Sequence, residues 1–281
     1  HAARRILHFV RERQTRFRQI TVVVRRLEDY ASEIKRVFNR YQIPYFIDQR
    51  ESIGLHPAVV VTRYALKLAA FHWKTDDLMA ALKTQLISRE LNLINELENA
   101  AIEFGWEGSQ WLRPLKQSGT HFEHLESFRQ KVIRPFTELY HALTESTNST
   151  SQQISGIRLV DSVRQFWEGI RLQDSLDQWE RDEIPNEGET APINRAIHSG
   201  TWSELQTWID NVELAFADTH RPLRDWIPVI EAGLTRLSIG VIPPTTDQVL
   251  IGSVDRTRSP NVELSFVLGL NETVFPALPS P

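Results

Sequence analysis

The strand signals of this sequence lie only near its two ends. Ile20–Val24 is a continuous β-branched run, typical of a strand covered on both faces of a parallel sheet, and Pro44–Asp48 is a second apolar run. Asp247–Val254 and Leu264–Leu270 are the other two strand signals, and about 180 residues without any such signal separate the pairs. Two consecutive domains would each be left with an undersized sheet. We therefore predict an α/β, predominantly helical chain whose one sheet takes strands from both ends.

Helical spacing of apolar residues predicts the remaining elements. Helices are expected at about 3–18 and 27–41, so that Ile20–Asp48 forms one strand–helix–strand unit. The central region is expected to be all helical, with helices at about 57–73, 75–88, 89–104, 121–144, 151–180, 201–217 and 222–238. The polar stretches 144–153 and 186–192 are expected to be turns or loops.

Composition excludes several classes of protein. The chain has 281 residues and is 41% hydrophobic, which is enough to bury a core. It has no cysteine, so a disulfide framework, a cysteine nucleophile and a cysteine-ligated metal or iron–sulfur site are excluded within it. It has no run of eighteen apolar residues and no signal-peptide pattern, so we expect a cytoplasmic location and no membrane partner. Because it starts at His1 rather than methionine and stops abruptly at Pro281, we expect an internal piece of a longer protein.

Charge is distributed unevenly along the chain. The net charge is −4, but residues 1–40 contain eleven basic and four acidic residues, a balance of +7 that leaves −11 for the remainder. Arginine at this density suits contacts with the phosphates of DNA or of a nucleotide. A solvated basic helix surface is the alternative, and composition leaves both open.

Motifs for complete catalytic sites are absent from the sequence. There is no G-x-x-x-x-G-K-S/T or G-x-G-x-x-G stretch for a full ATP site, and no G-x-S-x-G nucleophile elbow. Asp29, Glu33 and Lys35 match a nuclease pattern only superficially, because they fall on a predicted helix rather than a strand hairpin. His121 and His124 lack a third ligand for a metal. The tryptophans sit at helical spacing with Leu and Ile, which indicates core packing rather than base stacking.

Residue patterns at both ends resemble a known family. The sequence is similar to the AddB/RexB-type subunits of ATP-dependent helicase/deoxyribonucleases, relatives of the UvrD- and RecB-like superfamily 1 helicases. The matching segments, in order, are Arg18–Tyr30, Val37–Asp48, Leu97–Asn99 with Gly105, Gly108 and Trp111, Asp247–Arg256, Leu268–Glu272 and Phe275-Pro276.

The resemblance implies a fold and a parent protein. It implies that residues 1–56 and 243–281 form part of a RecA-like P-loop NTPase motor domain, the second of two, and that residues 57–242 are its helical insertion. The parent would be a helicase–nuclease subunit that uses ATP and Mg²⁺, works with a second such subunit, and processes DNA double-strand breaks for recombinational repair. The phosphate loop and the nuclease domain would lie outside this chain, which alone would hold no cofactor, hydrolyse no ATP and cut no DNA.

The resemblance also implies roles for single residues. Arg25, at the end of the first strand, is similar to the arginine of helicase motif IV, which approaches the nucleotide phosphates. Ser253, Arg256 and Arg258 occupy the place of motif V, which contacts the DNA backbone. The usual lysine-glycine-leucine-glutamate run is absent there, which favours a DNA-holding role over motor activity.

Three alternatives stay open at this point. Arg25 could be neutralised by Glu28 or Asp29, one turn away. Arg256 could be a surface residue paired with Asp255. The whole chain could be a helical protein-interaction scaffold with no direct DNA contact.

Overall fold

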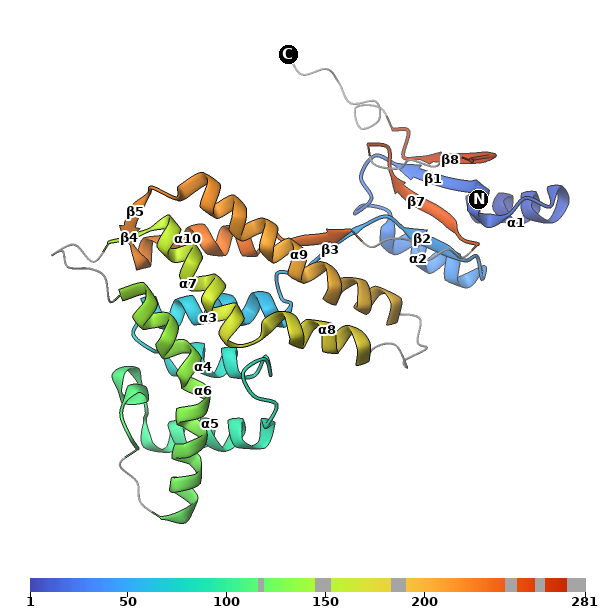
Figure 1. The fold of residues 1–281 in the computed structure, drawn as a ribbon. Helices are drawn as coiled ribbons and strands as arrows, with labels where there is room; N and C mark the ends of the chain where they lie inside the picture. The colour runs from blue at the N-terminus through green and yellow to red at the C-terminus, as the bar shows by residue number, and fades with distance from the viewer. Residues whose placement is uncertain (116–118, 145–152, 183–190, 241–246, 256–260, 272–281) are drawn as a thin grey trace. The chain divides into compact units, whose positions relative to one another are not determined.

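The chain divides into two compact units. One comprises His1–Glu51 with Gly240–Pro281, and the other is Ser52–Ile239 (Figure 1). The computed structural model describes residues 1–115, 119–144, 153–182, 191–240, 247–255 and 261–271. Each unit buries its own cluster of apolar residues.

The first unit is built on a four-stranded parallel sheet. Its strands are β1 (Ile20–Val24), β2 (Tyr45–Ile47), β7 (Val249–Ser253) and β8 (Leu264–Leu268), in the order β2-β7-β1-β8. The expected parallel sheet is therefore present, and two of its strands come from each end of the chain (Figure 1). The strand–helix–strand unit from β1 to β2 does not place those strands side by side, because β7 pairs between them.

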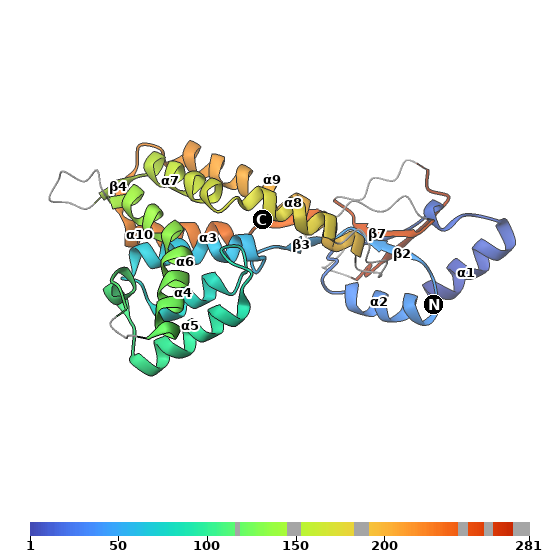
Figure 2. The same ribbon diagram turned by 60° about the horizontal axis from the view of Figure 1, so that its bottom comes forward.

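Two helices pack against one face of this sheet. Ile20, Val22 and Val24 of β1 project to that face and are buried with residues of α1 (Ala2–Arg13) and α2 (Ala31–Arg40). Figure 2 shows both helices on the same side of the strands. The first helix is shorter than expected because Gln14 adopts a left-handed φ of 53° and ends it, and a 3₁₀ turn, η1 (Phe17–Gln19), leads into β1.

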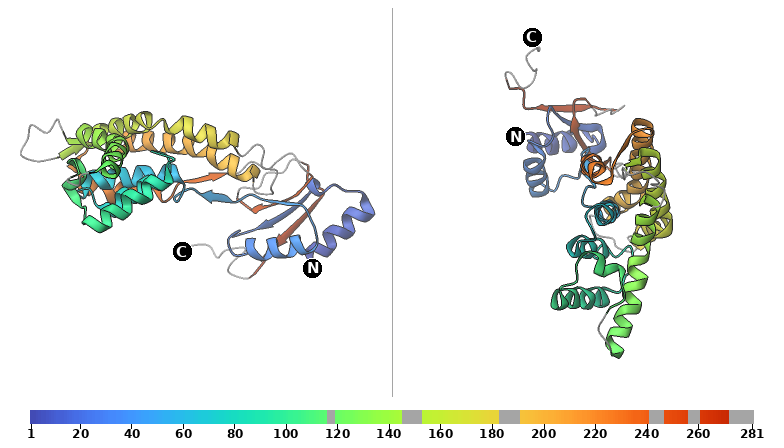
Figure 3. Two further views of the ribbon diagram at one scale, coloured as in Figure 1. Left: turned by 90° about the horizontal axis from the view of Figure 1, so that it is seen from below. Right: turned by 90° about the vertical axis from the view of Figure 1, so that its left-hand side faces the viewer.

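The second unit is mainly helical. Its helices are α3 (Pro57–Ala70), α4 (Thr75–Leu82), α5 (Leu91–Phe104), α6 (Thr120–Thr144), α7 (Gly156–Gly169), α8 (Leu172–Asp182), α9 (Ala191–Phe216) and α10 (Leu223–Leu234), with a 3₁₀ turn η2 (Gly108–Leu112). Figure 3 shows the long α9 running alongside α7 and α8, which follow each other along the chain. The chain enters and leaves this unit through β3 (Arg50–Ser52) and β6 (Ser238–Gly240), which pair as a two-stranded sheet.

The structure corrects two expectations for this region. The helix expected over 151–180 is instead strand β4 (Gln153–Ser155) followed by α7 and α8, and the break falls at Arg171, whose φ is 52°. The region expected to be free of strands contains β4 and β5 (His220–Pro222), which pair antiparallel. It also contains β6, because the helix expected over 222–238 ends at Leu234. Three-residue strands are too short to show the alternation of apolar and polar residues that would reveal them in the sequence.

Tryptophans form much of the helical core, as expected. Trp111, Trp167 and Trp226 are at most 1% exposed. The indole N–H of Trp167 donates to Thr62 Oγ1 at 2.8 Å, and that of Trp226 donates to the Ile154 carbonyl at 3.1 Å. Packing inside the unit, rather than base stacking, is therefore confirmed for these side chains. Across the described ranges, no helix combines the length and apolar character needed to span a membrane.

Candidate functional site

Arg25 and Ser253 come together at the carboxyl edge of the parallel sheet. Arg25 directly follows Val24, the last residue of β1, and the Cα partner of Val24 in β7 is Ser253. The N–H of Val254 continues the ladder by donating to the Val24 carbonyl at 3.0 Å. Two candidates separated by more than 220 positions in the sequence thus lie on neighbouring strand ends. In open parallel sheets this edge is where ligands usually bind.

Arg25 is exposed, and its positive charge is available to an anion. Of the two acidic residues proposed to neutralise it, Asp29 is paired with Arg26 instead, with Oδ2 2.8 Å from Nε. Arg25 makes no ion pair with any residue that the structure describes. A guanidinium remains protonated at any physiological pH. Within the described residues, the carboxyl end of β1 therefore carries an exposed cation that has no ion-pair partner.

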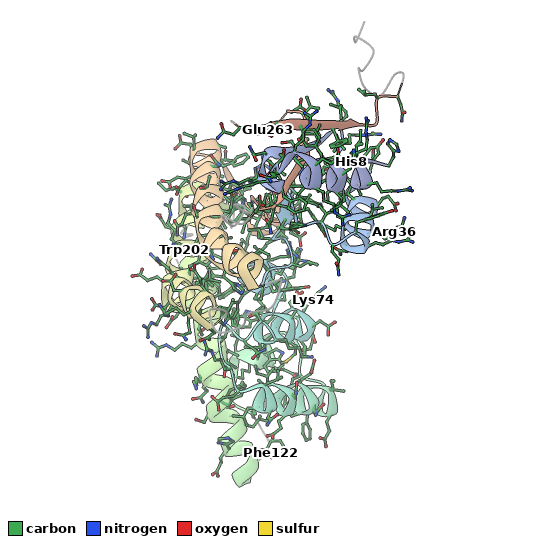
Figure 4. All side chains as sticks on the ribbon, turned by 90° about the vertical axis from the view of Figure 1, so that its right-hand side faces the viewer. His8, Arg36, Lys74, Phe122, Trp202 and Glu263 are labelled. Atoms are coloured by element: carbon green, nitrogen blue, oxygen red, sulfur yellow. The ribbon has the colours of Figure 1, made fainter. Side chains whose placement is uncertain are left out.

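The amino edge of the sheet has a different character, because its polar groups bond to one another. Glu263, just before β8, accepts from Thr15 Oγ1 at 3.1 Å and from Gln19 Nε2 at 2.6 Å. Asp247, before β7, accepts from the Arg18 N–H at 2.9 Å. Figure 4 labels Glu263 in this unit. These carboxylates tie the starts of the strands together.

Tyr30 and Gly269 also belong to the carboxyl edge, although the sequence did not single them out for a site. Gly269 follows β8 with a φ of 74°, which favours glycine. A Cβ at this position would lie 2.5 Å from the Tyr30 hydroxyl oxygen, so the tyrosine at the start of α2 packs directly on the turn. The only sequence signal for this contact was the glycine at the end of a predicted strand, because glycine often marks a place where another group comes close to the backbone.

Two sequence candidates cannot be placed. Arg256 and Arg258 lie outside the described residues, as does the alternative pairing of Arg256 with Asp255. Ser253 ends β7 and is half-buried.

The residues of the nuclease-like pattern are exposed: Asp29 lies in the turn before α2, and Glu33 and Lys35 lie on the surface of that helix. Glu33 Oε1 lies 2.5 Å from Arg36 Nη2, and this hydrogen bond lowers the pKa of the Glu33 carboxyl. Figure 4 labels Arg36 on α2. Because Asp29 and Glu33 both face arginines, neither is arranged to hold a cation. Among the residues that the structure describes, no three His, Cys, Asp or Glu side chains form a group able to hold a metal ion, and the side chain of His121 is outside that part.

Several known proteins that align with this chain carry the name of the B-type subunit of an ATP-dependent helicase/deoxyribonuclease. A protein of Desulforamulus reducens with this name is 29% identical over 99% of the chain, and so is one of Bacillus pumilus. One of Alkaliphilus oremlandii with the same name is 27% identical over 98% of it. No family model matches the chain.

These alignments confirm the resemblance stated from the sequence, and they run through the central helical region as well as both ends. The chain spans about a quarter of the length of the curated relatives it matches.

Proposed function

We propose that this chain is the second motor-like domain, with its helical insertion, of a helicase–nuclease subunit that processes broken DNA for recombinational repair in the cytoplasm. The observation that carries the proposal is the alignment with B-type helicase/deoxyribonuclease subunits along 98–99% of the chain. In this proposal residues 1–56 and 243–281 are the RecA-like part, and residues 57–242 are the insertion. A second helicase–nuclease subunit and DNA are the partners.

The sheet edge supports a role in holding phosphates. Arg25 offers an exposed cation beside the end of β7, where Ser253 offers a hydroxyl and the chain continues toward Arg256 and Arg258. A forked guanidinium donates several hydrogen bonds to one phosphate, which suits Arg25 to a nucleotide. The hydroxyl of Ser253 and the two later arginines suit the sugar–phosphate backbone of DNA.

ATP and Mg²⁺ would be held mainly by other parts of the longer protein. The sequence has no phosphate loop, and the described residues offer no group of three metal ligands. Arg25 is the residue that this chain would add to a nucleotide site, where its charge would stabilise negative charge on a phosphate. We therefore expect the purified chain to hydrolyse no ATP.

Binding to labelled DNA tests the proposal. Arg256→Ala is expected to weaken affinity by about threefold to tenfold, because one charged contact to phosphate contributes about 1 kcal/mol. Arg40→Ala is the matched control. Arg40 ends α2, which returns the chain from the carboxyl edge of the sheet to its amino edge, so this variant should bind as the wild type does.

Equal affinities of the wild type and a folded Arg256→Ala variant would contradict the assignment of Arg256. Rapid ATP hydrolysis by the chain alone would contradict the proposal that other parts of the longer protein hold ATP and Mg²⁺. No DNA binding even at low salt would favour the rival function, a protein-interaction scaffold.

A further inference from the structure

The helical unit contains a cavity of about 610 Å³ that the proposed function does not use. Its walls come from the end of α3 and the turn after it, from η2, from the last turns of α6, from β4, and from the start of α10. This volume is in the range of small-molecule sites, about 300–1,000 Å³. None of the described residues that line the cavity is acidic.

Trp73 is a wall of this cavity with an unused donor. The side chain is only 3% exposed, and its indole N–H has no hydrogen-bond partner in the described part of the chain. A buried N–H without a partner is unfavourable for the free energy of folding, because it loses its hydrogen bond to water and forms none in the protein. His72 and Trp73 have φ values of 60° and 56°, so the chain holds the indole here through a left-handed turn that non-glycine residues rarely adopt. A ligand that brings a hydrogen-bond acceptor would satisfy this donor.

Arg224 supplies positive charge at the same cavity. One of its N–H groups donates to His72 Nε2 at 2.8 Å, which leaves most of its five donors for another partner. Arg224 is the second residue of α10, and Pro222, which precedes that helix, offers no side-chain acceptor to its first turn. The positive end of the α10 dipole adds to the charge of Arg224, and Asp225, which is in the same turn but does not line the cavity, offsets part of that charge.

Tyr140 of α6 supplies an aromatic surface. It is half-buried, lines the cavity, and meets Trp73 edge to face with ring centroids 6.4 Å apart. The cavity thus combines a flat aromatic wall, a hydrogen-bond donor without a partner and a cation. A nucleotide has the matching parts: a planar base, carbonyl or ring-nitrogen acceptors on that base, and a phosphate.

We propose that this cavity is a nucleotide-binding pocket in which Tyr140 packs on the base, Trp73 donates to it and Arg224 binds the phosphate. The nucleotide could be free or the terminal unit of a DNA single strand, since both present the same groups. The pocket lies wholly within the helical unit and does not depend on the role proposed for the sheet edge.

The indole N–H signals of the whole chain in NMR test this pocket directly. The chain has eight tryptophans, and the signal missing from Trp73→Phe identifies Trp73. Addition of thymidine monophosphate should shift the Trp73 signal in a saturable way, while inorganic phosphate at equal concentration should not. A 5′-phosphorylated oligothymidine that shifts the signal at lower concentration than the mononucleotide would identify a DNA end as the ligand, and the reverse order would identify a free nucleotide.

Two arginine variants test whether Arg224 binds the phosphate of the nucleotide. Arg224→Gln should weaken binding of thymidine monophosphate about tenfold, because a hydrogen bond to a charged group contributes about 1.5 kcal/mol or more. Arg236→Gln is the matched control: it removes the same charge just beyond the other end of α10 from a residue that does not line the cavity. Unchanged signals from the other tryptophans would show that each variant is folded.

Three results would overturn the proposal. The first is no shift of the Trp73 signal at millimolar nucleotide, and the second is equal affinity in Arg224→Gln and the wild type. The third is an equal response to inorganic phosphate, which would indicate a general anion site. Loss of DNA binding by Arg256→Ala would bear on none of these outcomes, so the two proposals fail separately.

Discussion

His56 is a buried histidine whose hydrogen bonds define its tautomer. Its Nδ1 accepts from the Ala58 N–H at 3.2 Å and so caps the start of α3. Nε2 must therefore carry the proton, and it lies 3.1 Å from Nδ1 of His198 in α9, to which it donates. Burial, followed by the charge of His198, lowers the pKa of His56 to about 4. The ring is thus held neutral where two helices meet.

This lowered pKa predicts a loss of stability in acid. The unfolded chain binds the proton at the ordinary pKa of about 6.5, so the free energy of unfolding should fall as pH decreases from about 6.5 to 4, by up to about 3 kcal/mol. His56→Asn keeps a capping oxygen without a titratable ring and should flatten the profile. Urea unfolding at several pH values measures this. An equally steep profile in the variant would show that other groups cause the loss.

At the residue scale, the sequence named candidate residues but did not report which side chains surround them. It pointed to Arg25 and Ser253, and the register of β1 and β7 brings them together. It could not decide whether Asp29 pairs with Arg25 or Arg26, since both are within one turn and the choice depends on side-chain direction at the strand end. It also missed Trp73 and Arg224, because 151 positions separate them and only the packing of α3, α6 and α10 brings them to one cavity.

At the scale of elements, the junction between β4 and α7 depends on a glycine. Gly156 begins α7, its N–H donates to the Thr219 carbonyl at 2.9 Å, and an added Cβ would lie 2.0 Å from the Phe216 carbonyl oxygen. The obstacle is backbone, which cannot rotate away as a flexible side chain can. The end of α9 and the start of α7 therefore approach as closely as they do only because residue 156 has no side chain.

Alanine at two glycines of α7 should have opposite effects. Gly156→Ala is expected to lower the free energy of unfolding by about 1–3 kcal/mol, because the helix ends must move apart. Gly169→Ala, in the same helix, has open space around the new methyl group and should raise stability by roughly 0.5–1 kcal/mol. Denaturant unfolding of both variants checks this. A Gly156→Ala variant as stable as the wild type would contradict the close approach.

Helices and strands were predictable where the sequence has a long apolar run or a regular spacing of apolar residues. The β-branched run of β1 and the apolar runs of β7 and β8 appear within a few residues of their expected bounds. β4 and β5 were missed because they are three residues long and are held by pairing with each other, which no local pattern reports. The division of 151–180 was missed because its cause is the left-handed backbone of Arg171, a residue type that usually continues a helix.

At the scale of the whole molecule, two separate cores account for the alternation of patterns along the chain. The apolar cluster under the sheet draws on residues from both ends of the sequence, while the larger helical cluster draws only on residues between Ile53 and Ile239. Strand signals confined to the ends predicted that the sheet would need both. The basic first forty residues all belong to the unit with the sheet, and Arg25 is one of them.

The dependence of DNA affinity on salt tests the central claim, that this unit holds phosphates. With a labelled single strand and a series of NaCl concentrations, the account predicts that the logarithm of the association constant falls linearly with the logarithm of salt concentration. If Arg256 and Arg258 each neutralise a phosphate of the DNA, they should contribute a slope of about −1.4, since each contact contributes roughly −0.7. An affinity that does not change with salt, or no binding at the lowest salt, would contradict the claim.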